Sequence, residues 1–225
     1  MMKYCKFPST FILSIVFFIT VQAQPKNKID SLLRVLKTAT EDSSKANTLN
    51  SLGKESYLTG NYDQARKYSS DALQLCEKTN YEKGKIPAYL NTGLAYFLQG
   101  NYPEALKNYL TALPIAKKIN DKRGIANCYN NMGLVFTYQG NYAEALKKHL
   151  TALKIYREIG ETKGLINSYN NMGIIYEEQA HYPEALRSYF AALKISEQAG
   201  DKKATADAYY NIGNVNSIQN NLHDA

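Results

Sequence analysis

The sequence repeats itself with a fixed period of 40 residues, from Asn61 to its last residue, without an insertion or a deletion. Residues 101–140 and 141–180, aligned without a gap, are identical at 20 of 40 positions. A period of this length is typical of a solenoid, in which each unit buries its apolar face only against its neighbours. We therefore expect one elongated domain instead of a globular domain with a central core.

Each unit contains two helical patterns separated by short breaks. In the second pattern, apolar residues recur at the i, i+3, i+4, i+7 spacing of an amphipathic helix. Gly100 is placed to end the preceding helix, and Asn101 is placed as the N-cap of this one. The first pattern has an interior glycine in every copy, with an alanine twelve residues later, as in Gly93 and Ala105. We expect these two small residues to face each other and to let the paired helices approach closely.

The same residues resemble a known family signature. The spacing resembles that of the tetratricopeptide repeat, a helix-turn-helix unit, and is carried by Tyr89, Gly93, Tyr96, Gly100, Tyr102, Ala105, Tyr109 and Ala112. The resemblance covers residues 46–225 and implies an all-α fold, a right-handed α-α superhelix of about four full repeats and a truncated fifth. Residues 24–45 are expected to form a capping helix and a loop. The period of 40 in place of the commoner 34, and the missing closing proline, depart from the family pattern.

The first residues differ in kind from the repeats. Lys3 and Lys6 precede an apolar run over residues 11–21, and small residues lead up to Ala23. This pattern predicts a signal peptide over residues 1–23, cleaved between Ala23 and Gln24, with an uncleaved anchor as the alternative. The chain is then exported to the periplasmic or extracellular face of a bacterial membrane. Cleavage removes two lysines and lowers the formal net charge from +7 to +5. The basic residues lie at helical spacing on outer faces, so we expect no nucleic-acid binding.

No pattern of catalytic residues is visible. His149 occupies the repeat position of two tyrosines and is expected to be a packed ring, and His181 occupies the position of capping asparagines. We find no phosphate-binding loop, no metal-ligand spacing and no nucleophile with an evident base, so we expect no enzyme activity, no metal and no cofactor within residues 1–225. Cys76 and Cys128 are more than a repeat apart and are expected to be two separate buried thiols.

Asparagine is the polar residue that recurs. In the resembling family the first helices line the concave surface, where an amide side chain can both donate and accept hydrogen bonds to an extended peptide. Four asparagines recur at 40-residue intervals and form a ladder: Asn91, Asn131, Asn171 and Asn211. The alternative is that this ladder ties neighbouring repeats together. For the additional asparagines of the two central units we favour a role in the binding groove. The predicted groove residues are Asn91, Asn127, Asn130, Asn131, Asn167, Asn170, Asn171, Asn211, Leu94, Leu134, Ile174 and Tyr138.

The rest of the expected groove lining mixes apolar and acidic groups, including Phe97, Glu177 and Glu178. The lysine-rich clamp by which some family members hold a terminal carboxylate is not reproduced, because only Lys54 occupies such a place. The leading hypothesis is a non-catalytic exported scaffold that binds a peptide or protein along its concave face.

A second hypothesis starts from the sequence motifs YNNMG and NYPEALKNY, which follow an apparent signal peptide. Together they resemble the exported input regions of Bacteroidetes signalling proteins, such as membrane histidine kinases, nucleotide cyclases and transcriptional regulators. This resemblance implies an extracytoplasmic sensor with a membrane-anchored effector beyond Ala225, and the absence of a polar cap at that end leads us to expect a longer protein. A virulence or adhesion factor is a third, weaker hypothesis.

Overall fold

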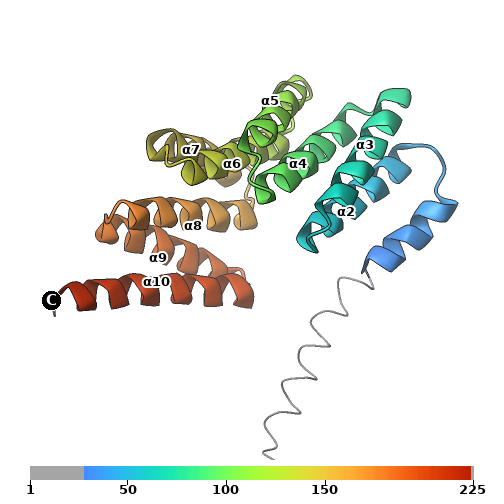
Figure 1. The fold of residues 1–225 in the computed structure, drawn as a ribbon. Coiled ribbons are helices and arrows are strands. Elements are labelled where there is room, and N and C mark those ends of the chain that lie inside the picture. The colour runs from blue at the N-terminus through green and yellow to red at the C-terminus, as the bar shows by residue number, and fades with distance from the viewer. Residues whose placement is uncertain (1–27, 224–225) are drawn as a thin grey trace, which may run out of the picture.

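The computed structural model describes residues 28–223, and within this range the regular elements are all helices (Figure 1). Residues 28–38 form a helix, and nine longer helices follow: α2 (Ser43–Leu58), α3 (Tyr62–Lys78), α4 (Glu82–Leu98), α5 (Tyr102–Lys118), α6 (Lys122–Tyr138), α7 (Tyr142–Glu158), α8 (Thr162–Glu178), α9 (Tyr182–Gln198) and α10 (Lys202–His223). The all-α architecture is as predicted from the repeat. The predicted signal peptide and its cleavage site lie outside the described residues.

The helices pair along the chain and stack into a curved array (Figure 1). In each unit the first helix packs against the second, as α4 does against α5. Each first helix also contacts the first helix of the next unit, from α2 and α4 to α8 and α10, whereas no two second helices of successive units contact each other in the described range. Elements on the inside of a curved stack lie closer together than those on its outside. The first helices therefore line the concave face and the second helices cover the convex face.

The short breaks between helices share one backbone device. After each of the helices α2 to α9, one residue with left-handed backbone angles reverses the direction of the chain. The amide of the residue that follows it donates a hydrogen bond to a carbonyl oxygen of the preceding helix, as Asn61 N does to Ser56 O at 2.8 Å. Glycine, which adopts this region without a steric penalty, occupies five of the eight positions. Asn80, Asn120 and Ala180, with φ of 52°, 55° and 57°, occupy the others. His181 is the N-cap residue before α9, although its side chain makes no capping hydrogen bond.

Three of the interior glycines make room for a ring. A β-carbon at Gly93 would overlap the Tyr109 ring, and one at Gly133 would lie 2.7 Å from His149 Cε1. The expected approach of the alanine twelve residues later is seen at Gly53, where a β-carbon would lie 3.3 Å from Ala65 O, whereas at Gly93 and Gly133 the nearest atoms belong to the ring. In an antiparallel pair the residue sixteen positions later faces the glycine, and there the chain has a large side chain in most units. His149 is fully buried, as predicted for a packed ring.

The core runs the length of the stack. The alanines of the second helices, such as Ala105 and Ala145, are fully buried and are flanked by larger side chains of neighbouring units. Cys76 and Cys128 are buried free thiols in separate parts of this core, as predicted. No helix in the described range is both long and apolar enough to span a membrane.

Candidate functional site

A pocket of about 640 Å³ opens between the first helices of two adjacent repeats. Leu134 and Tyr138 on α6 form one wall, and Asn171, Ile174 and Glu178 on α8 form the other. Tyr142, at the start of α7, closes the end of the pocket where the α6–α7 turn lies. Because α6 and α8 are both first helices, the pocket lies on the concave face. It brings together four of the predicted groove residues, which are Leu134, Tyr138, Asn171 and Ile174.

The pocket continues into an aromatic cluster on the preceding repeat. The Tyr138 ring meets Phe97 of α4 edge to face, with ring centroids 5.1 Å apart, and lies 6.4 Å from the ring of Tyr102. Tyr138 nevertheless keeps 65% of its surface exposed, and Ile174 keeps 40%. Large apolar side chains held in fixed positions and left open to solvent are typical of binding surfaces.

One carboxylate dominates the charge of the pocket. Glu178 is exposed and is the only charged side chain that lines the pocket. Its neighbour Glu177 bonds to other helices of the stack: it accepts hydrogen bonds of 2.8 Å from Tyr189 Oη on α9 and from Asn214 Nδ2 on α10. Glu178 makes neither a hydrogen bond nor an ion pair with any residue in the described range. The Glu177 carboxylate is thus fixed by hydrogen bonds to neighbouring helices, whereas the Glu178 carboxylate is free to interact with a ligand in the pocket.

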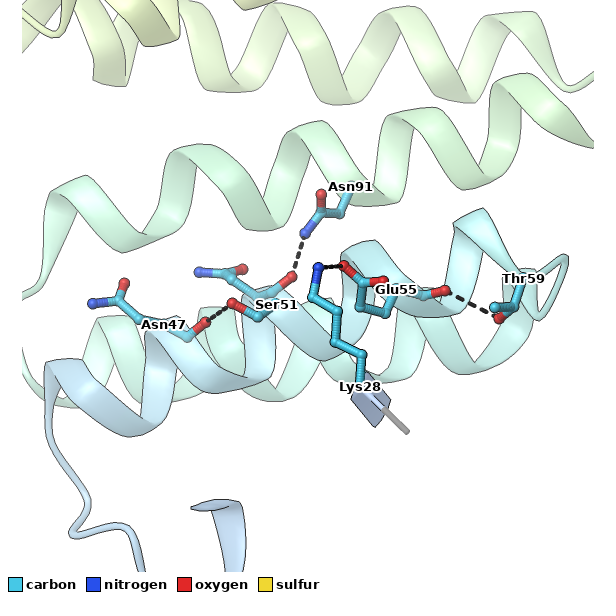
Figure 2. Close-up of polar contacts among 7 residues, drawn as sticks. Lys28, Asn47, Ser51, Glu55, Thr59 and Asn91 are labelled. Carbon is cyan, nitrogen blue, oxygen red and sulfur yellow. Dashed lines mark hydrogen bonds and ion pairs between the residues drawn. The ribbon is translucent and has the colours of Figure 1, made fainter. Parts of the chain in front are cut away.

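Part of the asparagine ladder joins neighbouring repeats. Asn91 Nδ2 donates to the backbone oxygen of Asn50 at 2.8 Å, from α4 to α2 (Figure 2). Asn171 Nδ2 lies 3.4 Å from Asn130 Oδ1, again one repeat back. Asn131, at the same repeat position as Asn91, makes no such bond within residues 28–223. For Asn91 these contacts match the alternative that the sequence left open, in which the ladder holds the stack together.

Asn130 belongs to a buried polar cluster at the centre of the array. Its Oδ1 lies 3.0 Å from His149 Nδ1 and 3.5 Å from Ser168 Oγ, and all three residues are buried. Burial lowers the pKa of His149 to about 4, so the ring is neutral at pH 7. The geometry is that of a protonated Nδ1 donating to the amide oxygen, which leaves the buried Nε2 without a partner. This cluster stabilises the packing of two repeats, and none of its three residues lines the pocket between α6 and α8.

The remaining predicted residues are distributed along the stack. Asn127 accepts a 2.7 Å hydrogen bond from Tyr156 Oη, and Asn170 is half-buried with no partner for its Oδ1. Asn167 lines a different, smaller pocket between α8 and α10. Leu94 and Asn211 are half-buried on α4 and α10. Their role in binding a partner stays a prediction.

Two features of this site were not predicted from the sequence. The first repeat has its own asparagines at the positions of Asn127 and Asn130, which are Asn47 and Asn50, so these positions are not confined to the central units. Asn50 Nδ2 donates to Gly84 O at 2.9 Å across the first repeat interface. Tyr142 was not among the predicted groove residues. An alignment of the units by repeat position reveals the asparagines, whereas the exposure of Tyr142 to the pocket depends on the angle between units.

The stacked helical pairs can be compared with known families. A sequence model described as the tetratricopeptide repeat matches residues 44–118, 85–158, 124–198 and 164–225. The chain belongs to the tetratricopeptide repeat family. The four overlapping matches begin about 40 residues apart, so each successive match starts one unit later. No curated protein sequence matches the chain.

Several solved protein structures have a similar fold. A signal transduction ATPase with numerous domains and a tetratricopeptide repeat sensor, from Pyrococcus horikoshii, is 20% identical, with a TM-score of 0.67 over 88% of this chain and 31% of that one. Aspartyl phosphate phosphatase F from Bacillus subtilis is 14% identical, with a TM-score of 0.72 over 84% and 52%. A Rap protein complexed with competence and sporulation factor is 18% identical, with a TM-score of 0.72 over 92% and 65%. The chain thus spans between about a third and two thirds of the length of these proteins, and the likeness concerns the fold.

Proposed function

We propose that this tetratricopeptide repeat array is a non-catalytic scaffold that binds a peptide or protein partner on its concave face. The observation that carries the proposal is the pocket between α6 and α8, where Tyr138 and Ile174 stay exposed beside the aromatic cluster. A pocket of about 640 Å³ has room for one or two side chains of a partner. The walls are helices and not loops, so the surface is largely formed before a partner arrives.

Two of the similar structures support this choice of function. The Rap protein was solved in complex with competence and sporulation factor, and the Pyrococcus protein is described as having a tetratricopeptide repeat sensor. At 18% and 20% identity these proteins make a recognition role for the present chain reasonable without naming its partner.

Site-specific photo-crosslinking tests the concave face directly. The crosslinker benzoylphenylalanine would replace Ile174 in one variant and Leu150 in a matched control. Leu150 is an exposed aliphatic residue on the second helix α7, 50% exposed against 40% for Ile174. We expect the Ile174 variant, and not the Leu150 variant, to form a discrete crosslinked product in the producing cells. Crosslinks from Leu150 alone would place the partner on the convex face and contradict the proposal.

A second candidate function is that of an extracytoplasmic input region of a membrane signalling protein. It rests on the signal-peptide pattern of residues 1–23, and on the repeat sensor of the Pyrococcus protein, which forms only part of a longer signalling chain. Export would be tested by fusing residues 1–60 to a reporter enzyme that is active only outside the cytoplasm. The gene downstream of the codon for Ala225 would be read for a membrane span followed by a kinase, cyclase or DNA-binding region. An inactive reporter would argue against export, and a stop codon directly after a capping helix would favour the free scaffold.

A further inference from the structure

We infer that the pocket between α6 and α8 selects an extended segment in which an apolar side chain lies two residues from a lysine or arginine. This inference rests on the proposed function and specifies the chemistry of the partner. It combines the shape of the pocket, the single charge on its wall and the distance between the apolar and acidic parts.

The apolar part of the pocket is formed by Leu134, Tyr138 and Ile174. Leu134 and Ile174 occupy the same position in consecutive repeats, so they lie side by side on the concave face, and both line the pocket. Tyr138 is held from behind by the edge-to-face contact with Phe97. An aliphatic or aromatic side chain that enters between these walls removes apolar surface from water on both sides, which is the main favourable term in such binding.

The acidic part is Glu178 alone. It is the last residue of the first helix α8. The carboxylates in the first turns of the second helices differ from it in having cationic neighbours; Glu144, for example, pairs with Lys147 and Lys148 at 3.6 and 3.7 Å. Glu178 has no such neighbour in the described range, and no lysine or arginine lines the pocket. A positive charge on the ligand would supply the missing counter-ion, and a carboxylate on the ligand would be repelled.

The repeat register places this charge at one point in the groove. The position of Glu178 is occupied by Leu58, Leu98, Tyr138 and Ile218 in the other units. The groove therefore has one acidic subsite among apolar ones, instead of an evenly charged surface. A ligand is thus fixed in register by its cation, while its apolar side chains occupy the neighbouring positions.

The spacing follows from helix and strand geometry. Ile174 and Glu178 are one helical turn apart on α8, so their side chains are separated by about 6 Å along the helix axis. An extended peptide rises about 3.3 Å per residue, and its side chains at i and i+2 point to the same face. An apolar residue and a cation two positions apart therefore match Ile174 and Glu178.

The test uses three sets of fluorescein-labelled 12-residue peptides with identical Gly-Ser flanks. Each has one leucine or phenylalanine and, two positions away, lysine, glutamine or glutamate. Fluorescence anisotropy would measure their binding to the purified protein and to two variants, Glu178→Gln and Glu158→Gln. The second variant removes the same charge from α7 on the convex face, where Glu158 lies 3.4 Å from Lys122. Ile174→Ser would be measured with all three peptide sets.

We expect the lysine peptides to bind the wild-type protein about fivefold more tightly than the glutamine peptides, and the glutamate peptides to bind most weakly. Glu178→Gln should reduce the lysine preference to less than about twofold, Glu158→Gln should keep it, and added salt should weaken it. Equal binding of the three sets, or a preference that survives in Glu178→Gln, would overturn the inference. If Ile174→Ser then still weakened all three sets, the groove would remain the binding site with a different chemistry. No binding of any set by the wild-type protein would overturn the inference, and the crosslinking experiment would decide the proposed function separately.

Discussion

Lys28 Nζ lies 2.5 Å from Glu55 Oε1, and this ion pair joins the first described residue of the chain to the interior of the first repeat (Figure 2). Glu55 is buried at a position where the later units have Ala95, Val135, Ile175 and Val215, all of them fully buried. Within residues 28–223 no further repeat precedes the first unit to cover this position. A carboxylate takes the place of an apolar side chain there, and the segment that precedes α2 supplies its cation.

The pair predicts opposite effects for its two residues. Lys28→Met should lower the free energy of unfolding by about 1 kcal/mol, because a buried carboxylate loses its partner while the exposed lysine limits the loss through solvent screening. Glu55→Val, which installs the side chain of the later units, should be neutral or stabilising. Urea denaturation of the two variants and of the double variant measures this. If the double variant is as unstable as Lys28→Met, the ion pair does not explain the loss.

Two interior glycines should respond oppositely to the same substitution. Gly93→Ala should destabilise the protein by about 1–3 kcal/mol, since the new β-carbon overlaps the Tyr109 ring. Gly213→Ala, at the same repeat position in α10, should stabilise the chain of residues 1–225 by about 1 kcal/mol, because no atom of the described residues lies within 4 Å and alanine favours the helix. Thermal unfolding followed by circular dichroism compares them. Stabilisation by both substitutions would mean that the ring moves aside at little cost.

The turn at Ala180 should improve with glycine. Ala180 adopts φ of 57° where most other turns have glycine, and an L-residue with a β-carbon is disfavoured there by about 1 kcal/mol. Ala180→Gly should therefore raise the free energy of unfolding by about that amount. Gly140→Ala, at the equivalent turn with φ of 73°, is the matched control and should lower it. Both values come from chemical denaturation, and an unchanged midpoint for Ala180→Gly would contradict this account of the turn.

Stability should fall in acid because of His149. Burial lowers its folded pKa to about 4, below the usual 6.5, so between these values the unfolded chain binds a proton that the folded chain does not. The contribution is complete above pH 6.5 and decreases as the pH falls towards 4, by about 3 kcal/mol in total. Urea denaturation at several pH values should show this slope, and His149→Phe should reduce it. His181→Asn, which changes an exposed histidine, should leave it unchanged; an equal slope in His149→Phe would exclude His149 as its cause.

The asparagines at one repeat position should contribute unequally to the free energy of unfolding. Asn91→Ala removes the 2.8 Å hydrogen bond to Asn50 O and should cost about 1 kcal/mol. Asn131→Ala, at the same position one unit later, should change stability by less than about 0.5 kcal/mol. Hydrogen exchange of the α2 amides would locate the difference at the first repeat interface. Equal losses for the two variants would show that the bond to α2 is not what distinguishes them.

The period of 40 residues made the fold predictable, because glycine or asparagine ends most helices and the apolar stripes repeat without a gap. The pocket was predictable in part: Leu134, Tyr138 and Ile174 follow from helix phase alone. The role of the asparagines was not predictable from the sequence, because an amide side chain can face either the next repeat or the groove. A rotation of a few tens of degrees between units decides which of the two surfaces it faces. Asn91 and Asn131 share one repeat position, yet only Asn91 bonds to its neighbour.

The contacts between successive units have a mechanical consequence. Each first helix contacts the first helix of the next unit, and each second helix also packs against that helix, so successive units meet along a broad interface. The pocket between α6 and α8 lies at the inner edge of one such interface. A side chain bound there would contact two units at once and favour one angle between them. Because each unit interacts only with its neighbours, a small change in that angle would displace the two ends of the array relative to each other.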